Sequence, residues 1–304
     1  MKKNQLGNSD LYVSEIGLGC MSFSQEQEQK AHYMIDFALD QGVNFLDTAD
    51  LYEFGGNEEM VGKAIKGKRS QVILGTKVGN RWKEDQEGWD WDPSKAYIKE
   101  QVKNSLKRLQ TDYIDLYQLH GGTLEDPTEE TSEAFEELKK EGYIRYYGIS
   151  SIRPNVIRRF VEQSSIVSVM SQYSILDRRP EEETLPLLSN KQLSLIARGP
   201  LAKGLLSNQW LTKLKENGYL DYKQDELRSI LELLQERLGG VATFAQVALR
   251  YALHDPTVAT VIPGASRMEQ LEEILATAHV PDLSHEVIRE IKSLTKENVY
   301  SAHR

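Results

Sequence analysis

Short apolar runs alternate eight times with stretches of helical periodicity along this chain. An apolar run of this kind is typical of a strand buried on both faces, and the stretch after it is typical of an amphipathic helix. Repeated strand–helix units specify a parallel sheet, and eight of them close that sheet into a barrel. We therefore predict an α/β fold, a (β/α)8 TIM barrel. The eight apolar runs span residues 13–18, 43–47, 72–77, 113–120, 144–150, 166–172, 193–198 and 258–262.

An open, doubly wound sheet is the main alternative to the barrel. That fold would carry a Gly-x-Gly-x-x-Gly turn after its first strand, but residues 17–22 read Gly-Leu-Gly-Cys-Met-Ser and lack the third glycine. Turn residues at 7–10 predict an N-terminal β-hairpin, and helical patterns at about 268–276 and 285–295 follow the last strand. We expect one domain over residues 1–304, a barrel with a hairpin cap and extra C-terminal helices.

Composition argues against several classes of function. The formal net charge is −9 over 304 residues, which disfavours a nucleic-acid surface or an anionic membrane face. The single cysteine, Cys20, rules out an intrachain disulfide and a cysteine-cluster metal site, and we expect no metal. No apolar run is long enough to span a membrane, and the first residues lack a signal-peptide core. A cytoplasmic protein with a small-molecule partner is therefore expected.

Polar side chains end six of the predicted strands. Because the carboxyl ends of parallel strands meet at one rim of a barrel, we expect these side chains to converge there. Tyr52 stands on the loop after the second strand and should lie beside them. The strand-end residues are Asp47, Lys77, His120, Ser150, Gln172 and Arg198.

Tyr52, Lys77 and Asp47 together could donate a proton. A phenol has a reference pKa of about 10, which is too high for ready proton transfer near neutral pH. A nearby ammonium favours the phenolate, and Asp47 could pair with Lys77 and so limit the cost of burying the amine. His120 could hydrogen-bond a substrate carbonyl. Such a site needs a source of electrons, which a nicotinamide would supply as hydride.

Three of these segments resemble the tetrad segments of the aldo-keto reductases: Asp-Thr-Ala-Asp-Leu-Tyr at 47–52, Gly-Thr-Lys at 75–77 and Tyr-Gln-Leu-His at 117–120. The chain looks like the bacterial branch that also resembles the potassium-channel β subunits. The resemblance implies an NADP(H)-dependent oxidoreductase that reduces aldehydes and ketones to alcohols on a (β/α)8 barrel. By the same implication Tyr52 is the general acid, assisted by Lys77, Asp47 and His120. The match continues in order through residues 148–151, 171–173, 199–206 and 262–266.

The resemblance also implies a set of contacts to NADP(H). Three polar side chains would hold the carboxamide of the nicotinamide, residues 200–204 would lie along the pyrophosphate, and residues 264–267 would surround the adenosine end. Arg267 is the candidate for the 2′-phosphate. The carboxamide contacts would be Ser150, Ser151 and Gln172. The full expected set is Cys20, Met21, Asp47, Ser150, Ser151, Gln172, Arg198, Gly199, Pro200, Leu201, Lys203, Gly204, Gly264, Ser266, Arg267, Gln270 and Glu273.

Three positions depart from the family pattern and bear on cofactor affinity and on the choice between NADP and NAD. Ser151 stands where many members have asparagine, and Ile274 stands where an asparagine often contacts adenine. Arg198 replaces the aromatic residue that often stacks on the nicotinamide, although a planar guanidinium can also stack. The segment 78–91 is expected to be a long polar loop over the mouth. Candidate substrate-pocket residues are Phe23, Phe54 and Trp82.

Two other classes of function are compatible with the residues. A Schiff-base lyase could use Lys77 as its nucleophile, since barrels also support that chemistry. A nicotinamide-binding regulatory or partner-binding subunit would bind the cofactor with little turnover. We expect a monomer or a weak homo-oligomer, and we expect Cys20 to be a packed small side chain near the mouth.

Overall fold

Eight parallel strands form one sheet within the described residues, which are 1–83, 87–238, 240 and 242–304 of the computed structural model. Strands that follow one another in this sheet also follow one another along the chain, so the eight predicted strands and their order are confirmed. The strands are β3 (Leu18–Gly19), β4 (Phe45–Asp47), β5 (Ile73–Val78), β8 (Ile114–Leu119), β9 (Ile144–Ser150), β10 (Ser168–Gln172), β11 (Ser194–Arg198) and β12 (Val258–Ile262).

The first and last strands meet and close the sheet into a barrel. Ile16, just before β3, forms a parallel bridge with Val261 of β12. The amide of Gly17 donates to the carbonyl oxygen of Val261 at 2.9 Å, and the amide of Val261 donates to the carbonyl oxygen of Glu15 at 3.0 Å. A Cβ on Gly17 would lie 2.8 Å from Cδ1 of Phe45, so the seam needs glycine at this position. The predicted (β/α)8 barrel is therefore found.

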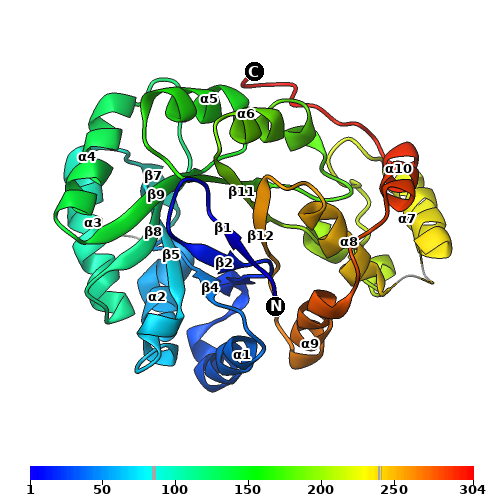
Figure 1. Ribbon diagram of the computed structural model, residues 1–304, viewed down its shortest axis with the longest axis horizontal. Helices are drawn as coiled ribbons and strands as arrows, with labels where there is room; N and C mark the ends of the chain where they lie inside the picture. Colours follow the sequence, from blue (N-terminus) through cyan, green and yellow to red (C-terminus); the bar gives the residue numbers. More distant parts are fainter. Residues whose placement is uncertain (84–86, 239, 241) are drawn as a thin grey trace.

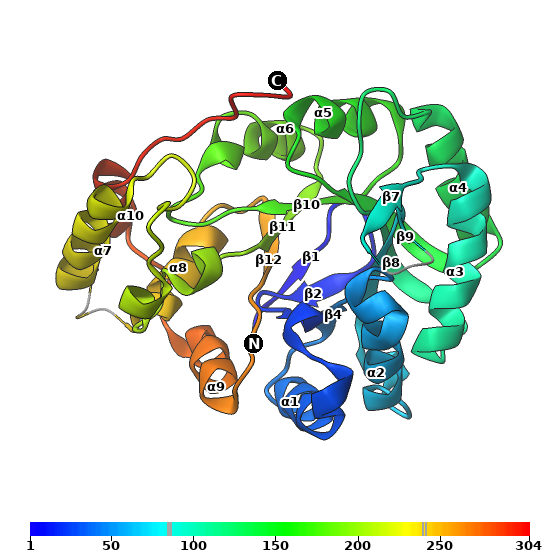
Figure 2. The same cartoon turned by 180° about the vertical axis from the view of Figure 1, so that it is seen from behind.

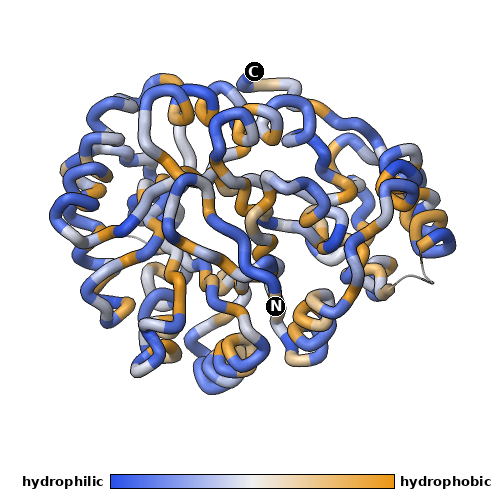
Figure 3. Tube along the Cα trace, viewed as in Figure 1, coloured by the Kyte–Doolittle hydropathy of each residue, from blue (hydrophilic) through white to orange (hydrophobic). Residues whose placement is uncertain are grey.

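A ring of helices covers the outside of the barrel (Figures 1 and 2). Apolar and polar segments alternate along these helices in Figure 3, as expected for helices that bury one face. Two helices, α7 and α8, follow β11, and two more, α9 and α10, follow β12, which agrees with the expected extra C-terminal helices. The helices are α1 (Glu28–Asp40), α2 (Gly56–Ala64), α3 (Lys95–Leu109), α4 (Thr128–Lys140), α5 (Pro154–Gln163), α6 (Thr184–Asn190), α7 (Gln224–Leu238), α8 (Phe244–Leu253), α9 (Met268–Ala276) and α10 (His285–Leu294).

The predicted N-terminal hairpin covers the amino ends of the barrel strands. Its strands β1 (Lys3–Gln5) and β2 (Tyr12–Ser14) pair antiparallel, and they lie across the middle of the ring of helices in Figure 1. The amide of Gly7 donates to Oγ of Ser194 at 2.9 Å, at the first residue of β11. The hairpin also adds apolar side chains to the barrel interior. The buried interior cluster consists of Leu6, Leu11, Val13, Phe45, Leu116, Val167, Met170, Ile196, Ala259 and Ile262.

The expected long polar loop at 78–91 is corrected by the structure. Strands β6 (Asn80–Trp82) and β7 (Trp89–Trp91) form an antiparallel hairpin, with Trp82 opposite Trp89. The indole of Trp91 donates to Oδ1 of Asp126 at 2.9 Å and packs against the backbone at Gly79. The prediction was wrong because the charged residues between the two short strands hide their alternation.

Among the described residues, no helix has the length and apolar character required to cross a bilayer.

Candidate active site

Six of the predicted site residues lie at the carboxyl ends of neighbouring strands, opposite the hairpin. The parallel register sets Gln172 of β10 beside Arg198 of β11, and the end of β5 beside β8. Tyr52 begins the short 3-10 segment η3 (Tyr52–Gly55) after β4. The strand-end residues are Asp47 of β4, Lys77 of β5, His120 directly after β8, Ser150 of β9, Gln172 of β10 and Arg198 of β11.

The ammonium of Lys77 joins Asp47 and Tyr52. Its Nζ donates to Oδ2 of Asp47 at 2.6 Å, to the carbonyl oxygen of Thr48 at 2.7 Å and to the phenol oxygen of Tyr52 at 3.3 Å. The Lys77 and Asp47 side chains are only 1% and 4% exposed. Burial alone would lower the pKa of Lys77, but the neighbouring Asp47 and Tyr52 raise it above its ordinary value. Lys77 is therefore a charged, buried donor that holds the Tyr52 phenol.

His120 completes the group and is neutral. Burial, together with the positive charges of Lys77 and Arg198, lowers the pKa of His120 to about 3. Its ring meets the Tyr52 ring edge-on, with 6.0 Å between the centroids. Nδ1 is buried and has no hydrogen-bond partner among the described residues. A neutral imidazole placed in this way can donate a hydrogen bond to a carbonyl oxygen beside the phenol.

The turn that carries Tyr52 has an unusual backbone that the sequence analysis missed. Glu53, Phe54 and Gly55 follow Tyr52 with φ of 48°, 54° and 89°, all in the left-handed region. Such conformations cost free energy in non-glycine residues and persist only where the surroundings hold them. The pair Gly55–Gly56 in the sequence was the one local signal for a sharp turn. This turn directs the chain from the end of β4 into α2.

A second buried ion pair supports the rim from behind, and the sequence analysis did not identify it. Glu58 of α2 is fully buried and accepts hydrogen bonds from Oγ1 of Thr76 at 2.6 Å and from Nε of Arg108 at 2.7 Å. The Arg108 guanidinium lies 5.7 Å from the Trp82 ring, and Trp82 stacks on Phe54. The ion pair thus links α2 and α3 to the aromatic side chains at the rim.

The aromatic side chains proposed for the substrate pocket differ in exposure. Phe54 is 44% exposed and stacks on Trp82 with 5.7 Å between the ring centroids, so these two residues stay candidates for substrate contact. Phe23 is 5% exposed and packs in the hydrophobic core outside the barrel. The Phe23 backbone carbonyl oxygen accepts a hydrogen bond from Nδ2 of the Asn57 side chain at 2.9 Å.

Cys20 and Met21 belong to the 3-10 segment η1 (Cys20–Ser22) that follows β3. The Cys20 side chain is fully buried, as expected for a packed small side chain, and burial raises the pKa of its thiol well above the ordinary range. A thiol in this state is a poor nucleophile. Met21 is 68% exposed, so it is accessible for the predicted cofactor contact. Only the backbone of Cys20 is left for such a contact.

Three neighbouring strands end in polar residues, and no hydrogen bond of their side chains is found among the described residues: Ser150, Gln172 and Arg198. Ser151 is different, because its Oγ accepts a hydrogen bond from the amide of Arg153 at 3.2 Å. The loop after β11 begins at Gly199, which has φ of +63° and open space around a built Cβ apart from the Gln172 side chain at 3.9 Å. Free donors and acceptors beside an open backbone fit the amide and phosphate groups of a nicotinamide cofactor.

The remaining residues of the loop after β11 fold back on themselves. Lys203 has φ of +59° and is exposed, and Pro200 is buried. Leu201 is partly buried, and its carbonyl oxygen accepts a hydrogen bond from the amide of Gly204 at 2.8 Å. Gly204 has φ of +90° and packs against the Lys213 side chain. These residues therefore form a tight surface loop at the mouth of the barrel.

The predicted adenosine contacts lie at the start of α9. Arg267 is exposed, occupies the N-cap position and donates to Oε1 of Gln209 at 3.2 Å. Oε1 of Gln270 accepts hydrogen bonds from both the amide and Oγ of Ser266, at 3.1 and 3.2 Å. Gly264 is exposed and Glu273 is partly exposed. Ile274 is 3% exposed and belongs to the core.

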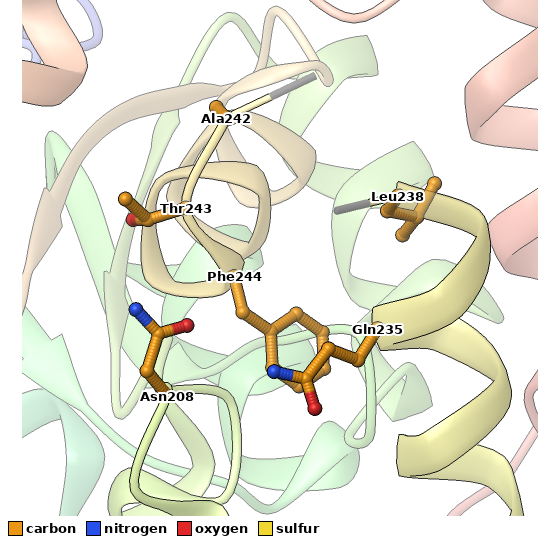
Figure 4. Close-up of a pocket in the computed structure, with 6 residues that line it drawn as sticks. All are labelled: Asn208, Gln235, Leu238, Ala242, Thr243 and Phe244. Atoms are coloured by element: carbon orange, nitrogen blue, oxygen red, sulfur yellow. The ribbon is translucent and has the colours of Figure 1, made fainter. Parts of the chain in front are cut away.

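A cavity of about 320 Å³ lies away from the tetrad, between the segment after β11, α7 and the start of α8 (Figure 4). Its wall includes the ring of Phe244 and the amides of Gln235 and Asn208. None of the predicted catalytic residues lines it. We place the chemistry at the strand-end rim, because the charged and hydrogen-bonding groups needed for proton transfer converge there and not in this cavity.

A comparison of the sequence with family models decides the family. The model described as "Aldo/keto reductase family" matches residues 15–296. This chain belongs to the aldo/keto reductase family. The predicted membership of this family is therefore confirmed. The chain is an enzyme, an oxidoreductase.

Individual relatives of this aldo/keto reductase cover nine tenths or more of its length. "Uncharacterized oxidoreductase YqkF" of Bacillus subtilis (strain 168) is 55% identical over 308 residues, with 100% of both chains covered. "Aldo-keto reductase YhdN" of the same organism is 33% identical over 295 residues, covering 90% of this chain and 88% of YhdN. The holo form of aldo-keto reductase AKR11C1 from Bacillus halodurans has a TM-score of 0.94 at 56% identity, covering 100% of this chain and 99% of that one. Its apo form has a TM-score of 0.86 at 52% identity, with the same coverage.

Proposed function

We propose that this aldo/keto reductase reduces aldehydes and ketones to alcohols with NADP(H), and that Tyr52 is the general acid. One observation carries the proposal: the Lys77 ammonium contacts Asp47 and the Tyr52 phenol at once, at 2.6 and 3.3 Å. When Tyr52 gives its proton to a carbonyl oxygen, the adjacent ammonium stabilises the phenolate that is left. Asp47 holds Lys77 in place, and neutral His120 donates a hydrogen bond to the same carbonyl oxygen.

The residues available to a nicotinamide cofactor fit this chemistry. Bound NADPH supplies the hydride that the protein itself lacks. Ser150, Ser151 and Gln172 would hold the ring amide, residues 200–204 would lie along the pyrophosphate, and Arg267 would meet the 2′-phosphate. Support comes from Ser150 and Gln172, which lie at neighbouring strand ends without a side-chain hydrogen bond to a described residue, and from the high TM-score to the holo form of AKR11C1.

The ion pair disfavours the lyase alternative. Only a neutral amine attacks a carbonyl to form a Schiff base, and the raised pKa of Lys77 keeps this amine protonated. Borohydride trapping with a ketone would yield a covalent lysine adduct in a lyase, and we expect none here. The regulatory-subunit alternative, the cytoplasmic location and the monomeric or weakly associated state stay predictions.

Oxidation of NADPH with 4-nitrobenzaldehyde tests the proposal. We expect Tyr52→Phe to lose turnover by about 100-fold or more, because it removes the proton donor. Tyr33→Phe is the matched control, since Tyr33 is an exposed tyrosine on α1, 62% exposed, and should behave as wild type. Equal turnover by Tyr52→Phe and wild type would remove Tyr52 from its role. Parallel assays with NADH test the choice of NADP over NAD.

A further inference from the structure

Arg198 differs from the other arginines that are buried or largely buried in the described part of the chain. Most of the others have a carboxylate within about 3 Å, and the partly buried Arg153 and Arg159 donate to backbone carbonyl oxygens instead, as expected for a guanidinium that has left water. Arg198 is largely buried at the end of β11, yet no ion pair or side-chain hydrogen bond of its guanidinium is found among the described residues. The paired arginines are Arg69 with Asp115 at 2.7 Å, Arg108 with Glu58 at 2.6 Å, Arg178 with Glu181 at 3.0 Å, Arg179 with Asp177 at 2.7 Å and Arg250 with Glu15 at 2.9 Å.

The groups around Arg198 do not supply a negative charge that balances its positive charge. The carboxylates that act on it are Asp47, which is already bound by Lys77, and Asp177, which accepts two hydrogen bonds from Arg179. Two further neighbours are uncharged near neutral pH: Tyr300, because burial raises the pKa of its phenol, and His120, because burial lowers the pKa of its imidazole. Among these neighbours, Arg198 is therefore a largely buried positive charge without a carboxylate of its own.

This charge lies where hydride transfer takes place in the proposed function. The charge of Arg198 reaches Asp47, Tyr52 and His120, the same groups that would hold the reacting carbonyl. A ring that delivers hydride to that carbonyl has to enter the same mouth. The nicotinamide ring is neutral in NADPH and positively charged in NADP+. A fixed positive charge in a partly dry site repels only the oxidised form.

We propose that Arg198 makes the site bind NADPH more tightly than NADP+ and so biases the enzyme toward carbonyl reduction. This inference rests on the proposed function, because it needs a nicotinamide at the tetrad. An aromatic side chain at this position would stack on either redox form with little preference for charge. A guanidinium can also stack, but it discriminates between the two forms.

Direct binding measurements test the inference without turnover. Isothermal titration calorimetry would give Kd for NADPH and for NADP+, two ligands that differ only in the nicotinamide. We expect the ratio Kd(NADP+)/Kd(NADPH) to fall about tenfold or more in Arg198→Met, and to stay near the wild-type value in Arg198→Lys, which keeps the charge. Arg228→Met, an exposed arginine on α7, is the control for net charge and should leave the ratio unchanged.

Each other outcome has a defined meaning. An unchanged ratio in Arg198→Met overturns the inference. The inference is also overturned if Arg198→Met leaves the ratio unchanged but weakens the binding of carbonyl compounds that bear a carboxylate. Arg198 would then bind the substrate. Failure of wild type to bind either cofactor refutes the proposed function itself, and the inference falls with it. If thermal unfolding shows that Arg198→Met does not fold, Arg198→Gln removes the charge with a polar side chain and gives the same readout.

Discussion

Nζ of Lys77 lies 2.6 Å from Oδ2 of Asp47, and both side chains are almost completely removed from solvent. A pair of this kind is costly to break from one side only, because the partner left behind is an unpaired charge in the interior. The same pair holds the Tyr52 phenol. Nζ of Lys77 therefore contributes both to the stability of the fold and to the proposed chemistry.

The first prediction separates these two roles. Lys77→Met should lower the free energy of unfolding by about 3–5 kcal/mol, because the Asp47 carboxylate stays buried without its partner. The double variant Asp47→Leu/Lys77→Met should recover much of that loss, since no charge remains. Urea unfolding measures both, and NADPH oxidation should stay abolished in both. A single variant as stable as wild type would contradict the ion-pair argument.

The second prediction concerns pH and His120. The pKa of His120 is about 3 in the folded protein and about 6.5 in an unfolded chain, so the unfolded chain binds the proton first as pH falls. The stability contributed by neutral His120 is therefore complete above pH 6.5 and is lost as pH falls from 6.5 toward 3, by up to about 1.4 kcal/mol per pH unit. His120→Asn lacks this dependence. Denaturant unfolding of both proteins between pH 8 and 5 measures the difference, and parallel curves below pH 6.5 would refute the prediction.

The third prediction addresses the ion pair behind the rim. Arg108→Met should destabilise the protein by about 3–5 kcal/mol, since it leaves the fully buried Glu58 unpaired. Adding Glu58→Gln in the same chain should restore part of the loss. Lys63→Met is the matched control, because Lys63 pairs with Glu28 on the surface and should change the unfolding midpoint little. Equal effects of Arg108→Met and Lys63→Met would count against a structural role for the buried pair.

The fourth prediction tests the seam of the barrel. Gly17→Ala places a methyl group 2.8 Å from Cδ1 of Phe45 and 3.1 Å from Cγ2 of Ile262, so ring and strand have to move apart. We expect a loss of about 1–3 kcal/mol in urea unfolding, as for other overpacked interiors. An unchanged unfolding midpoint would mean that the seam adjusts without cost.

The sequence was sufficient to predict the barrel and the residues at its rim, because both follow from local patterns. A buried strand reads as an apolar run, and parallel pairing then places Lys77 and His120 at one end without further information. The β6–β7 hairpin was missed because each strand has three residues, too few for a period to emerge. The left-handed turn at Glu53 and Phe54 was missed because neither residue type signals it.

Other features depend on neighbours that are distant in the chain. Glu58 looked like an ordinary acidic residue near a helix start, and only Arg108, from the next helix, makes it a buried partner. Phe23 was a candidate for the substrate pocket, but its side chain packs in the core. The missing counter-charge of Arg198 is a property of all the surrounding elements at once, and no single segment encodes it.

The hairpin of β1 and β2 determines from which end of the barrel a ligand can reach the tetrad. It fills the amino end of the barrel with Leu6, Leu11 and Val13, all buried, so that end offers no passage. Among the described residues, access to the tetrad therefore lies at the rim with Tyr52 and Arg198. Under the proposed function, departing alcohol and incoming aldehyde share this rim, and a ligand that occupies it excludes the next.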